Sequence, residues 1–163
     1  MCKCYQGGLI KLLIPFFVGI FIIAILDQAA KLFAAAFLPS LKTIPIIENI
    51  FHLTYVENTG AGFGVFSDHT WILTTLTILV IVAVVTYMTA KRPKEKTFVT
   101  ALTFMMGGAV GNVIDRVRLG YVIDFFDFTL IDFPVFNVAD CFITVGAALF
   151  VVYIIFLSDK KEK

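Results

Sequence analysis

Four long, mostly apolar runs divide this chain, and each is long enough to cross a bilayer as a helix. They cover approximately residues 9–27, 70–90, 97–115 and 139–158. A helix of about 18 residues reaches about 27 Å, close to the thickness of the hydrocarbon layer. Backbone groups inside lipid must form their hydrogen bonds within the segment. Because 60% of the residues are hydrophobic and only 15% are charged, we expect a single all-α polytopic membrane domain over residues 1–163.

The distribution of Lys and Arg predicts how these spans are oriented. Nine of the thirteen basic residues lie in residues 1–11, 91–96 and 159–163. The positive-inside rule then places both termini, the loop 91–96 and the tail 159–163 in the cytoplasm. Residues 28–69 and 116–138 become the extracytoplasmic segments.

The first run also allows a second interpretation, as a cleaved signal peptide followed by the small alanines at 34–36. The run is longer than a usual signal-peptide core, and Asp27 interrupts the approach to those alanines. We therefore favour a retained first span.

The sequence gives little support for metal binding, disulfides or nucleic-acid binding. Cys2, Cys4 and Cys141 make no disulfide framework, and the first two are interpreted as an incidental tail. His52 and His69, the only histidines, lack metal-ligand spacing. The net charge of +1 argues against a nucleic-acid partner. We expect no metal and no cofactor.

The longer extracytoplasmic segment contains signals for a small sheet. Residues 44–50 and 52–56 are rich in Ile, Thr, Tyr and Val, which is typical of strands, and residues 57–64 form a turn-rich loop. The glycines at 60, 62 and 64 precede a membrane span and not the helix of a βαβ unit, so they do not indicate a nucleotide site. They serve either a tight turn or the pairing of bare backbone with an extended peptide.

Two features of the third run concern packing and charge. Gly107 and Gly111 form a GxxxG pair, which predicts close packing against another helix. Asp115 and Arg116 follow at the end of the run. Arg116 is either an ion-pair partner or carbonyl clamp, or a fixed cation that orients a carboxylate or a substrate carbonyl.

Acidic residues flank the last run. Asn137 is a favoured N-cap, and Asp140 at the third helical position suits the positive end of a helix, so helix capping alone could explain both. Asp124 lies among Ile and Phe, where burial would raise the pKa of its carboxyl and suit it to acid chemistry near neutral pH. Asp127 and Asp132 are interpreted as ordinary loop acids.

Five short stretches, in order along the chain, carry a resemblance to a known family. The chain resembles the bacterial lipoprotein signal peptidases (signal peptidase II), which are membrane aspartyl proteases. The matching stretches are residues 27–31, 57–64, 108–116, 122–125 and 136–140. Cys141 stands where such proteins often carry Ser, and the Cys-Lys-Cys at residues 2–4 is outside the pattern; neither affects the expected chemistry.

The resemblance implies a site and a reaction. Asp124 and Asp140 would form a catalytic pair that activates water and cleaves just before a diacylglyceryl-modified cysteine of a prolipoprotein. Other matching positions would shape or support the site: Asp27, Lys31, Asn58, Gly60, Asn112, Asp115, Arg116, Asn137 and Ala139.

The resemblance also implies a setting for that site. We expect an extracytoplasmic β-cradle and a short surface helix within residues 28–70, a location in the bacterial cytoplasmic membrane and an active site at its outer face. One chain is enough to build the site, so a monomer is expected. Membrane lipids and cyclic-peptide inhibitors such as globomycin are expected partners.

Two other classes compete with a peptidase. Intramembrane acids also mark ion paths in small transporters and proton channels, but here the acids gather at one rim and none lies near mid-membrane. A membrane scaffold would explain the spans and the GxxxG pair, but not the pairing of Asp124 with Asp140.

Overall fold

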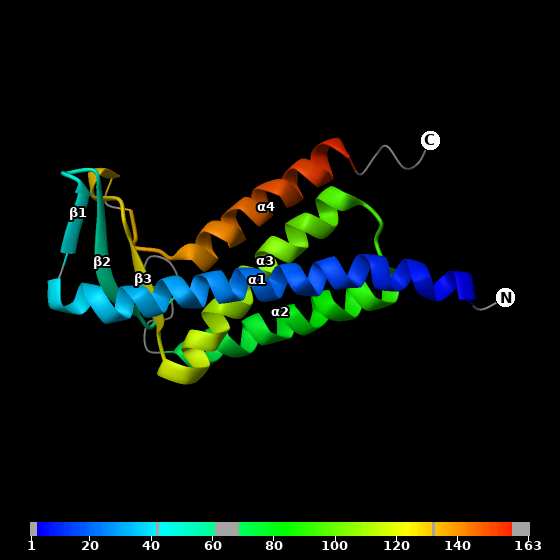
Figure 1. Cartoon of the computed structure of the whole chain (residues 1–163), viewed down its shortest axis with the longest axis horizontal. Helices are drawn as coiled ribbons and strands as arrows, with labels where there is room; N and C mark the ends of the chain where they lie inside the picture. Colours follow the sequence, from blue (N-terminus) through cyan, green and yellow to red (C-terminus); the bar gives the residue numbers. More distant parts are fainter. Residues whose placement is uncertain (1–2, 42, 61–68, 132, 158–163) are drawn as a thin grey trace.

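The computed structural model describes residues 3–41, 43–60, 69–131 and 133–157. It contains four long helices and a small antiparallel sheet (Figure 1). The helices are α1 (Lys3–Leu41), α2 (Thr70–Lys91), α3 (Lys96–Leu119) and α4 (Val138–Phe156). The strands are β1 (Thr43–Ile47), β2 (Phe51–Asn58) and β3 (Val122–Asp127), and a 3₁₀ turn, η2, covers Thr129–Ile131.

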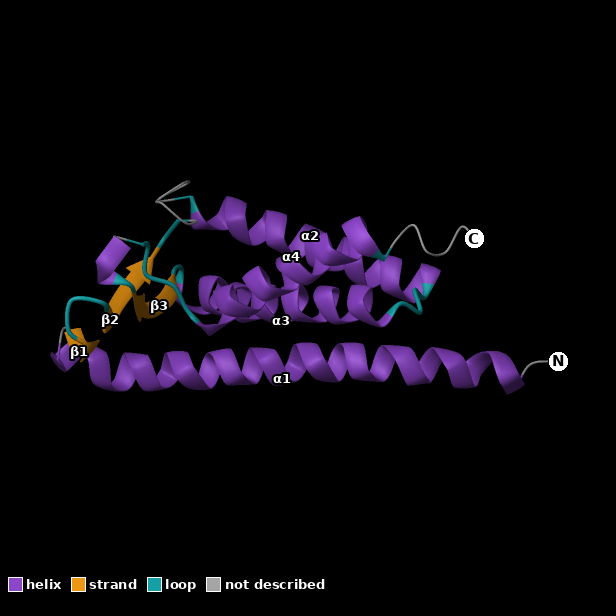
Figure 2. Cartoon of the chain, turned by 90° about the horizontal axis from the view of Figure 1, so that it is seen from above, coloured by secondary structure: helices purple, strands orange, loops and turns teal. Residues whose placement is uncertain are grey.

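The predicted four-helix membrane fold is confirmed. Each of the four helices is long and apolar enough to cross a membrane. The beginning of α1 and the end of α4 lie at one end of the bundle, and the sheet lies at the other (Figures 1 and 2). Helix α3 packs against all three of the other helices. The exact span limits and the division into cytoplasmic and outer segments remain predictions.

Helix α1 does not end where the first apolar run ends. It continues to Leu41, so residues 28–41 extend the first helix, and the described part of residues 28–70 contains no separate short helix. The reason is a buried stripe at helical spacing, formed by Asp27, Lys31, Ala34 and Leu38. The stripe packs this end of α1 against the bundle and the sheet, so tertiary contacts keep the chain helical beyond the apolar run.

Small residues bring α3 close to its neighbours, as the GxxxG pair predicted. A Cβ atom on Gly107 would lie 2.7 Å from Cβ of Ile23 in α1. A Cβ atom on Gly108 would collide with the backbone carbonyl oxygen of Ala139 in α4. Helices in lipid gain little from hydrophobic burial, so such close backbone contact supplies much of their association.

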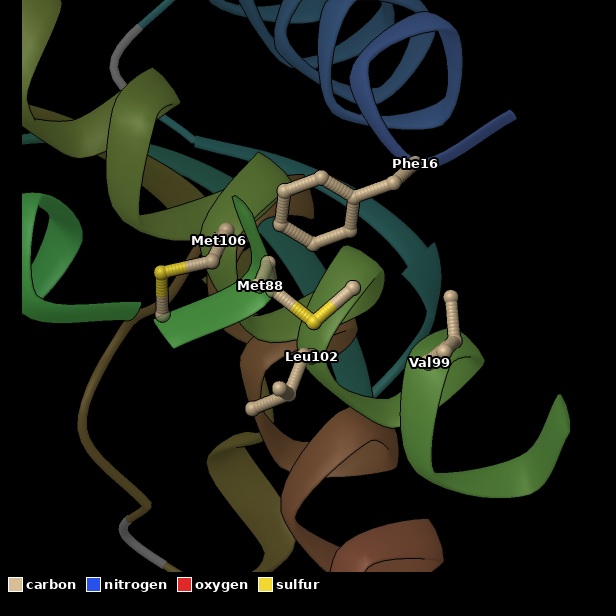
Figure 3. Packing of buried hydrophobic residues seen from close by; sticks show 5 residues of the cluster. All are labelled: Phe16, Met88, Val99, Leu102 and Met106. Carbon is tan, nitrogen blue, oxygen red and sulfur yellow. The ribbon is translucent and has the colours of Figure 1, made fainter. Parts of the chain in front are cut away.

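A hydrophobic cluster closes the end of the bundle away from the sheet. Figure 3 shows Phe16 of α1 and Met88 of α2 packed with Val99, Leu102 and Met106 of α3. All five side chains are buried. The cluster fixes three helices to one another and leaves the polar residues to gather at the opposite end.

The sheet has the order β1-β2-β3, with both neighbouring pairs antiparallel. The first two strands confirm the predicted strand-like runs. The third was not predicted: residues 122–127 pair with β2 and are largely buried. Consequently Asp127 is not a loop acid, because it ends β3 and accepts a 2.7 Å hydrogen bond from the Thr54 hydroxyl. Asp132 lies outside the described residues.

Candidate active site

All of the proposed site residues meet at the sheet end of the bundle. Helices α1, α3 and α4 contribute to the group, as do β2, β3 and the residues just after β2. One continuous network of hydrogen bonds and ion pairs joins Asp27, Lys31, Asn58, Gly60, Asn112, Asp115, Arg116, Asp124, Asn137, Ala139 and Asp140. Residues far apart in the sequence therefore form a single polar cluster.

A buried ammonium group lies at the centre of this polar cluster. Lys31 is 1% exposed, and its Nζ lies 2.8 Å from Oδ2 of Asp27 and 2.9 Å from Oδ2 of Asp115. Asp27 also accepts a 2.9 Å hydrogen bond from the backbone N–H of Ala139 at the start of α4. Buried charges persist only when they are paired and hydrogen-bonded. This arrangement therefore joins α1, α3 and the first turn of α4.

Asn112 connects this ion cluster to Asp140. Its Oδ1 accepts from Nζ of Lys31 at 2.8 Å and from Nδ2 of Asn137 at 3.1 Å. Its Nδ2 donates to Oδ1 of Asp140 at 2.9 Å. Because an ammonium group can only donate, Lys31 fixes which end of the Asn112 amide faces Asp140.

Asn137 connects the two candidate catalytic carboxylates. Its Nδ2 donates to Oδ1 of Asp124 at 2.6 Å, and its backbone N–H donates to Oδ2 of Asp140 at 3.2 Å. Its Oδ1 accepts from the backbone N–H of Asp140 at 3.0 Å. The last two bonds form the capping box of α4, so the predicted N-cap is confirmed. The same residue both begins the helix and bridges the acids.

The turn after β2 completes the site from the other side. Nδ2 of Asn58 donates to Oδ2 of Asp124 at 2.9 Å, and Oδ1 of Asn58 accepts from the Gly60 N–H at 3.0 Å. Nη2 of Arg116 donates to the Gly60 carbonyl oxygen at 3.2 Å. Arg116 is thus a carbonyl clamp, one of the roles expected from the sequence. Its buried Nε has no hydrogen-bond partner among the described residues.

A cavity of about 200 Å³ opens onto these groups. Asp124 and Asp140 both line it, together with Asn58, Asn112 and Arg116. Its apolar wall comes from Val122, the segment 133–136 and the side chain of Thr144. Two carboxylates, amide donors and a guanidinium therefore face one space large enough for part of a peptide.

Burial sets the protonation behaviour of Asp124. Its side chain is almost fully buried, and this loss of solvent raises the pKa of its carboxyl to about 6. Hydrogen bonds from Asn58 and Asn137 oppose the rise in pKa, while the nearby carboxylate of Asp140 adds to it. The direction of this change in pKa agrees with the rise expected from the apolar sequence neighbours of Asp124.

The sequence did not single out every residue of this region. Gln28 donates to Oδ1 of Asp115 at 2.8 Å and to the carbonyl oxygen of Gly111 at 3.2 Å. The only sequence feature that pointed to Gln28 was its position next to Asp27, within a stretch that matches the family. Thr144 lies one helical turn after Asp140, and that spacing could have placed it on the cavity side of α4.

Comparison with known proteins identifies the family. A family model described as signal peptidase (SPase) II matches residues 19–156. A lipoprotein signal peptidase from Clostridium acetobutylicum is 42% identical over 141 residues, which cover 85% of this chain and 92% of the relative. One from Caldanaerobacter subterraneus is 46% identical over 128 residues, covering 78% and 86%. A solved bacterial membrane enzyme has a similar fold, with a TM-score of 0.78 and 28% identity over 91% of this chain and 92% of its own.

The fold and the family match together define a polytopic membrane peptidase of the aspartic class. The chain belongs to the signal peptidase II family. This assignment confirms the resemblance and the prediction of an enzyme. The rival interpretations as a transporter or a scaffold find no support in these comparisons.

Proposed function

We propose that this peptidase removes signal peptides from diacylglyceryl-modified prolipoproteins and cleaves just before the lipidated cysteine. Asp124 and Asp140 form the catalytic pair. The family and the names of the relatives support the reaction. The single observation that carries the choice of residues is the bridge by Asn137, which binds both carboxylates at the wall of one cavity.

The proposed mechanism uses one proton shared by two acids. Two neighbouring carboxylates cannot both ionise cheaply, so one stays protonated. The ionised member takes a proton from a water molecule, whose oxygen attacks the scissile carbonyl carbon. The protonated member gives its proton to the carbonyl oxygen. When the C–N bond breaks, the departing amine takes up the proton first removed from water. Partial exclusion of solvent strengthens these hydrogen bonds.

Polar and apolar surfaces are available for the two parts of the substrate. Asn58, Asn112 and Arg116 carry donors that face the cavity and suit the carbonyl groups of an extended peptide. An apolar groove of about 360 Å³ runs between α1 and α3 and is lined by side chains including Phe17, Phe21 and Ile114. Such a groove suits an acyl chain or the apolar face of a signal helix.

The location follows from the same arrangement. We place the chain in the bacterial cytoplasmic membrane with both termini in the cytoplasm and the site at the outer face. The concentration of Lys and Arg near the termini and in residues 91–96 supports this orientation, and so does the position of the sheet at the far end of the helices. We further expect a monomer that needs no metal or cofactor and binds globomycin.

The experiment that tests this proposal compares three carboxyl-to-amide variants in purified enzyme. The substrate is a synthetic prolipopeptide with a diacylglyceryl cysteine. Asp124→Asn and Asp140→Asn should each lower kcat by more than about a hundredfold, because each removes a proton-transfer group. Asp127→Asn is the matched control, since Asp127 lies on the same strand as Asp124 but does not line the cavity.

The outcomes separate the possibilities. Wild-type turnover by either of the first two variants would exclude the proposed pair. Equal cleavage of the substrate without its lipid would leave the pair intact and exclude the proposed substrate class. Globomycin should inhibit wild-type turnover, and the cleavage site should be read by mass spectrometry of the products.

A further inference from the structure

Three asparagine side chains deliver their amide hydrogens to the catalytic pair, and each is held in one orientation. Asn58 and Asn137 have their Oδ1 atoms bound by backbone N–H groups, of Gly60 and Asp140 respectively. A backbone N–H can only donate, so neither side chain can reverse its amide without losing that bond. In both cases Nδ2 is left to donate to Asp124.

Asn112 follows the same pattern with a different donor. Its Oδ1 is held by the ammonium group of Lys31 at 2.8 Å, and its Nδ2 donates to Asp140. The donor here is a charged side chain from another helix, fully buried and fixed by Asp27 and Asp115. A cation bound to an amide oxygen also polarises the amide, which strengthens its N–H as a donor.

We propose that Lys31 is a positioning residue which, through Asn112, keeps Asp140 as the ionised member of the pair and leaves Asp124 as the proton donor. This inference rests on the proposed function, because it assigns the two proton states within that pair. Lys31 does not line the cavity, so it acts through Asn112 and not on the substrate.

The surroundings of the two carboxylates support this assignment. Asp140 is at the third position of α4, where the positive end of the helix dipole and the capping box favour a carboxylate. Asp124 lies on a strand and is not part of the first turn of a helix. Burial also raises the pKa of Asp124 to about 6, which favours its protonated form.

Other charged groups act on Asp140 from every neighbouring element. Arg116 of α3 and Asp124 of β3 are near enough to interact with it electrostatically. Behind Asn112 lie Lys31 and Asp27 of α1 and Asp115 of α3. Lys31, Asp27 and Asp115, called the rear group below, carry one positive and two negative charges. Any test must therefore keep the net charge of this group constant.

The assignment fixes the path of each proton. Asp140 accepts a proton from the attacking water while the water oxygen bonds to the carbonyl carbon. Asp124 donates its proton to the carbonyl oxygen. On collapse, the carbon–nitrogen bond breaks, Asp140 returns its proton to the amine nitrogen, and Asp124 recovers its proton from the hydroxyl group. Both acids regain their starting states after one turnover.

The test measures kcat/KM against pH for wild type and for the double variant Lys31→Met/Asp115→Asn. This pair of changes removes one cation and one anion, so the rear group keeps its net charge, while Asn112 loses its charged donor and keeps only the bond from Asn137. We expect the acidic limb of the profile to move up by about one pH unit, and kcat/KM at the optimum to fall about tenfold. Lys31→Met alone should move the limb in the same direction but destabilise the fold more.

Gln28→Leu is the matched control, because Gln28 donates a hydrogen bond to Asp115 but not, among the described residues, to the side chain of Asn112. It should lower thermal stability and leave the acidic limb at its wild-type pH. A folded double variant with an unmoved limb would overturn the role of Lys31. Full activity of Asp124→Asn would instead overturn the proposed function, so the two failures are distinguishable.

Discussion

The amide nitrogen of Asn137 lies 2.6 Å from Oδ1 of Asp124. The same residue also donates its backbone N–H to Asp140. One residue at the start of a helix therefore holds both carboxylates, Asp124 through its side chain and Asp140 through its backbone. A site built in this way is preorganised, because its geometry does not depend on the arrival of substrate.

Asn137→Ser separates the capping role of this residue from its bridging role. Serine is also a good N-cap, so α4 should keep its first turn. Its hydroxyl is too short to replace the amide that reaches Asp124. We expect the free energy of unfolding to fall by about 1–2 kcal/mol, while kcat/KM falls about a hundredfold. Thermal unfolding followed by circular dichroism, together with the peptidase assay, measures both; wild-type kcat/KM would contradict the bridging role.

Stability should decrease as the pH rises through the titration of Asp124. An unfolded chain has the ordinary Asp pKa of 3.8, whereas burial raises the pKa of Asp124 to about 6 in the folded chain. Between these values the folded state binds more protons, so the stabilisation is complete below about pH 4 and is lost as the pH rises past about 6. The loss is at most about 3 kcal/mol.

Asp124→Asn removes that titration. Its apparent melting temperature in detergent should therefore exceed that of wild type by a margin that grows between pH 4 and pH 7. If the difference between the melting temperatures of wild type and Asp124→Asn stays constant across this pH range, Asp124 titrates at its ordinary pKa.

Gly108→Ala should separate α3 from the start of α4. The added methyl group would collide with the carbonyl oxygen of Ala139 and lie 2.8 Å from Ile143. We expect a destabilisation of about 1–3 kcal/mol and a larger loss of activity, because Asp140 follows Ala139 directly. Val145→Ile, which adds one carbon at an exposed position of α4, is the control and should melt like wild type.

Arg116 should affect catalysis more than folding. One of its nitrogens holds the Gly60 carbonyl, and its Nε has no partner among the described residues. We expect Arg116→Ala to lower kcat/KM about a hundredfold, since a donor for developing negative charge is lost. Arg116→Lys keeps the positive charge but loses the planar guanidinium with its several N–H donors, so it should recover activity only partly. If Arg116→Ala loses membrane insertion or stability before activity, the role of Arg116 is structural.

Much of this architecture is predictable from local sequence. Long apolar runs determine membrane helices because lipid offers the backbone no other partner. The capping box at Asn137 and Asp140 is visible because its spacing is local, and the glycines of α3 reveal close packing for the same reason. The raised pKa of Asp124 follows from its apolar neighbours in the sequence.

The remaining features depend on contacts between distant segments. Helix α1 continues past its apolar run because Lys31 finds acids on both α1 and α3, and a single segment cannot show that pairing. Strand β3 was missed because its partner, β2, lies more than sixty residues away. The orientation of the Asn112 side chain depends on three residues together. Lys31 lies in α1, Asp140 lies in the first turn of α4, and Asn137 is the N-cap of α4.

The length of α1 has a mechanical consequence. Its 39 residues extend about 58 Å, whereas a bilayer core is only about 30 Å thick. The lipid-embedded part and the part carrying Asp27 and Lys31 thus belong to one continuous helix. Thinner or thicker membranes change the tilt of a membrane helix, and a change in the tilt of α1 would move Lys31, which binds Asn112. Turnover in proteoliposomes should accordingly vary with acyl-chain length.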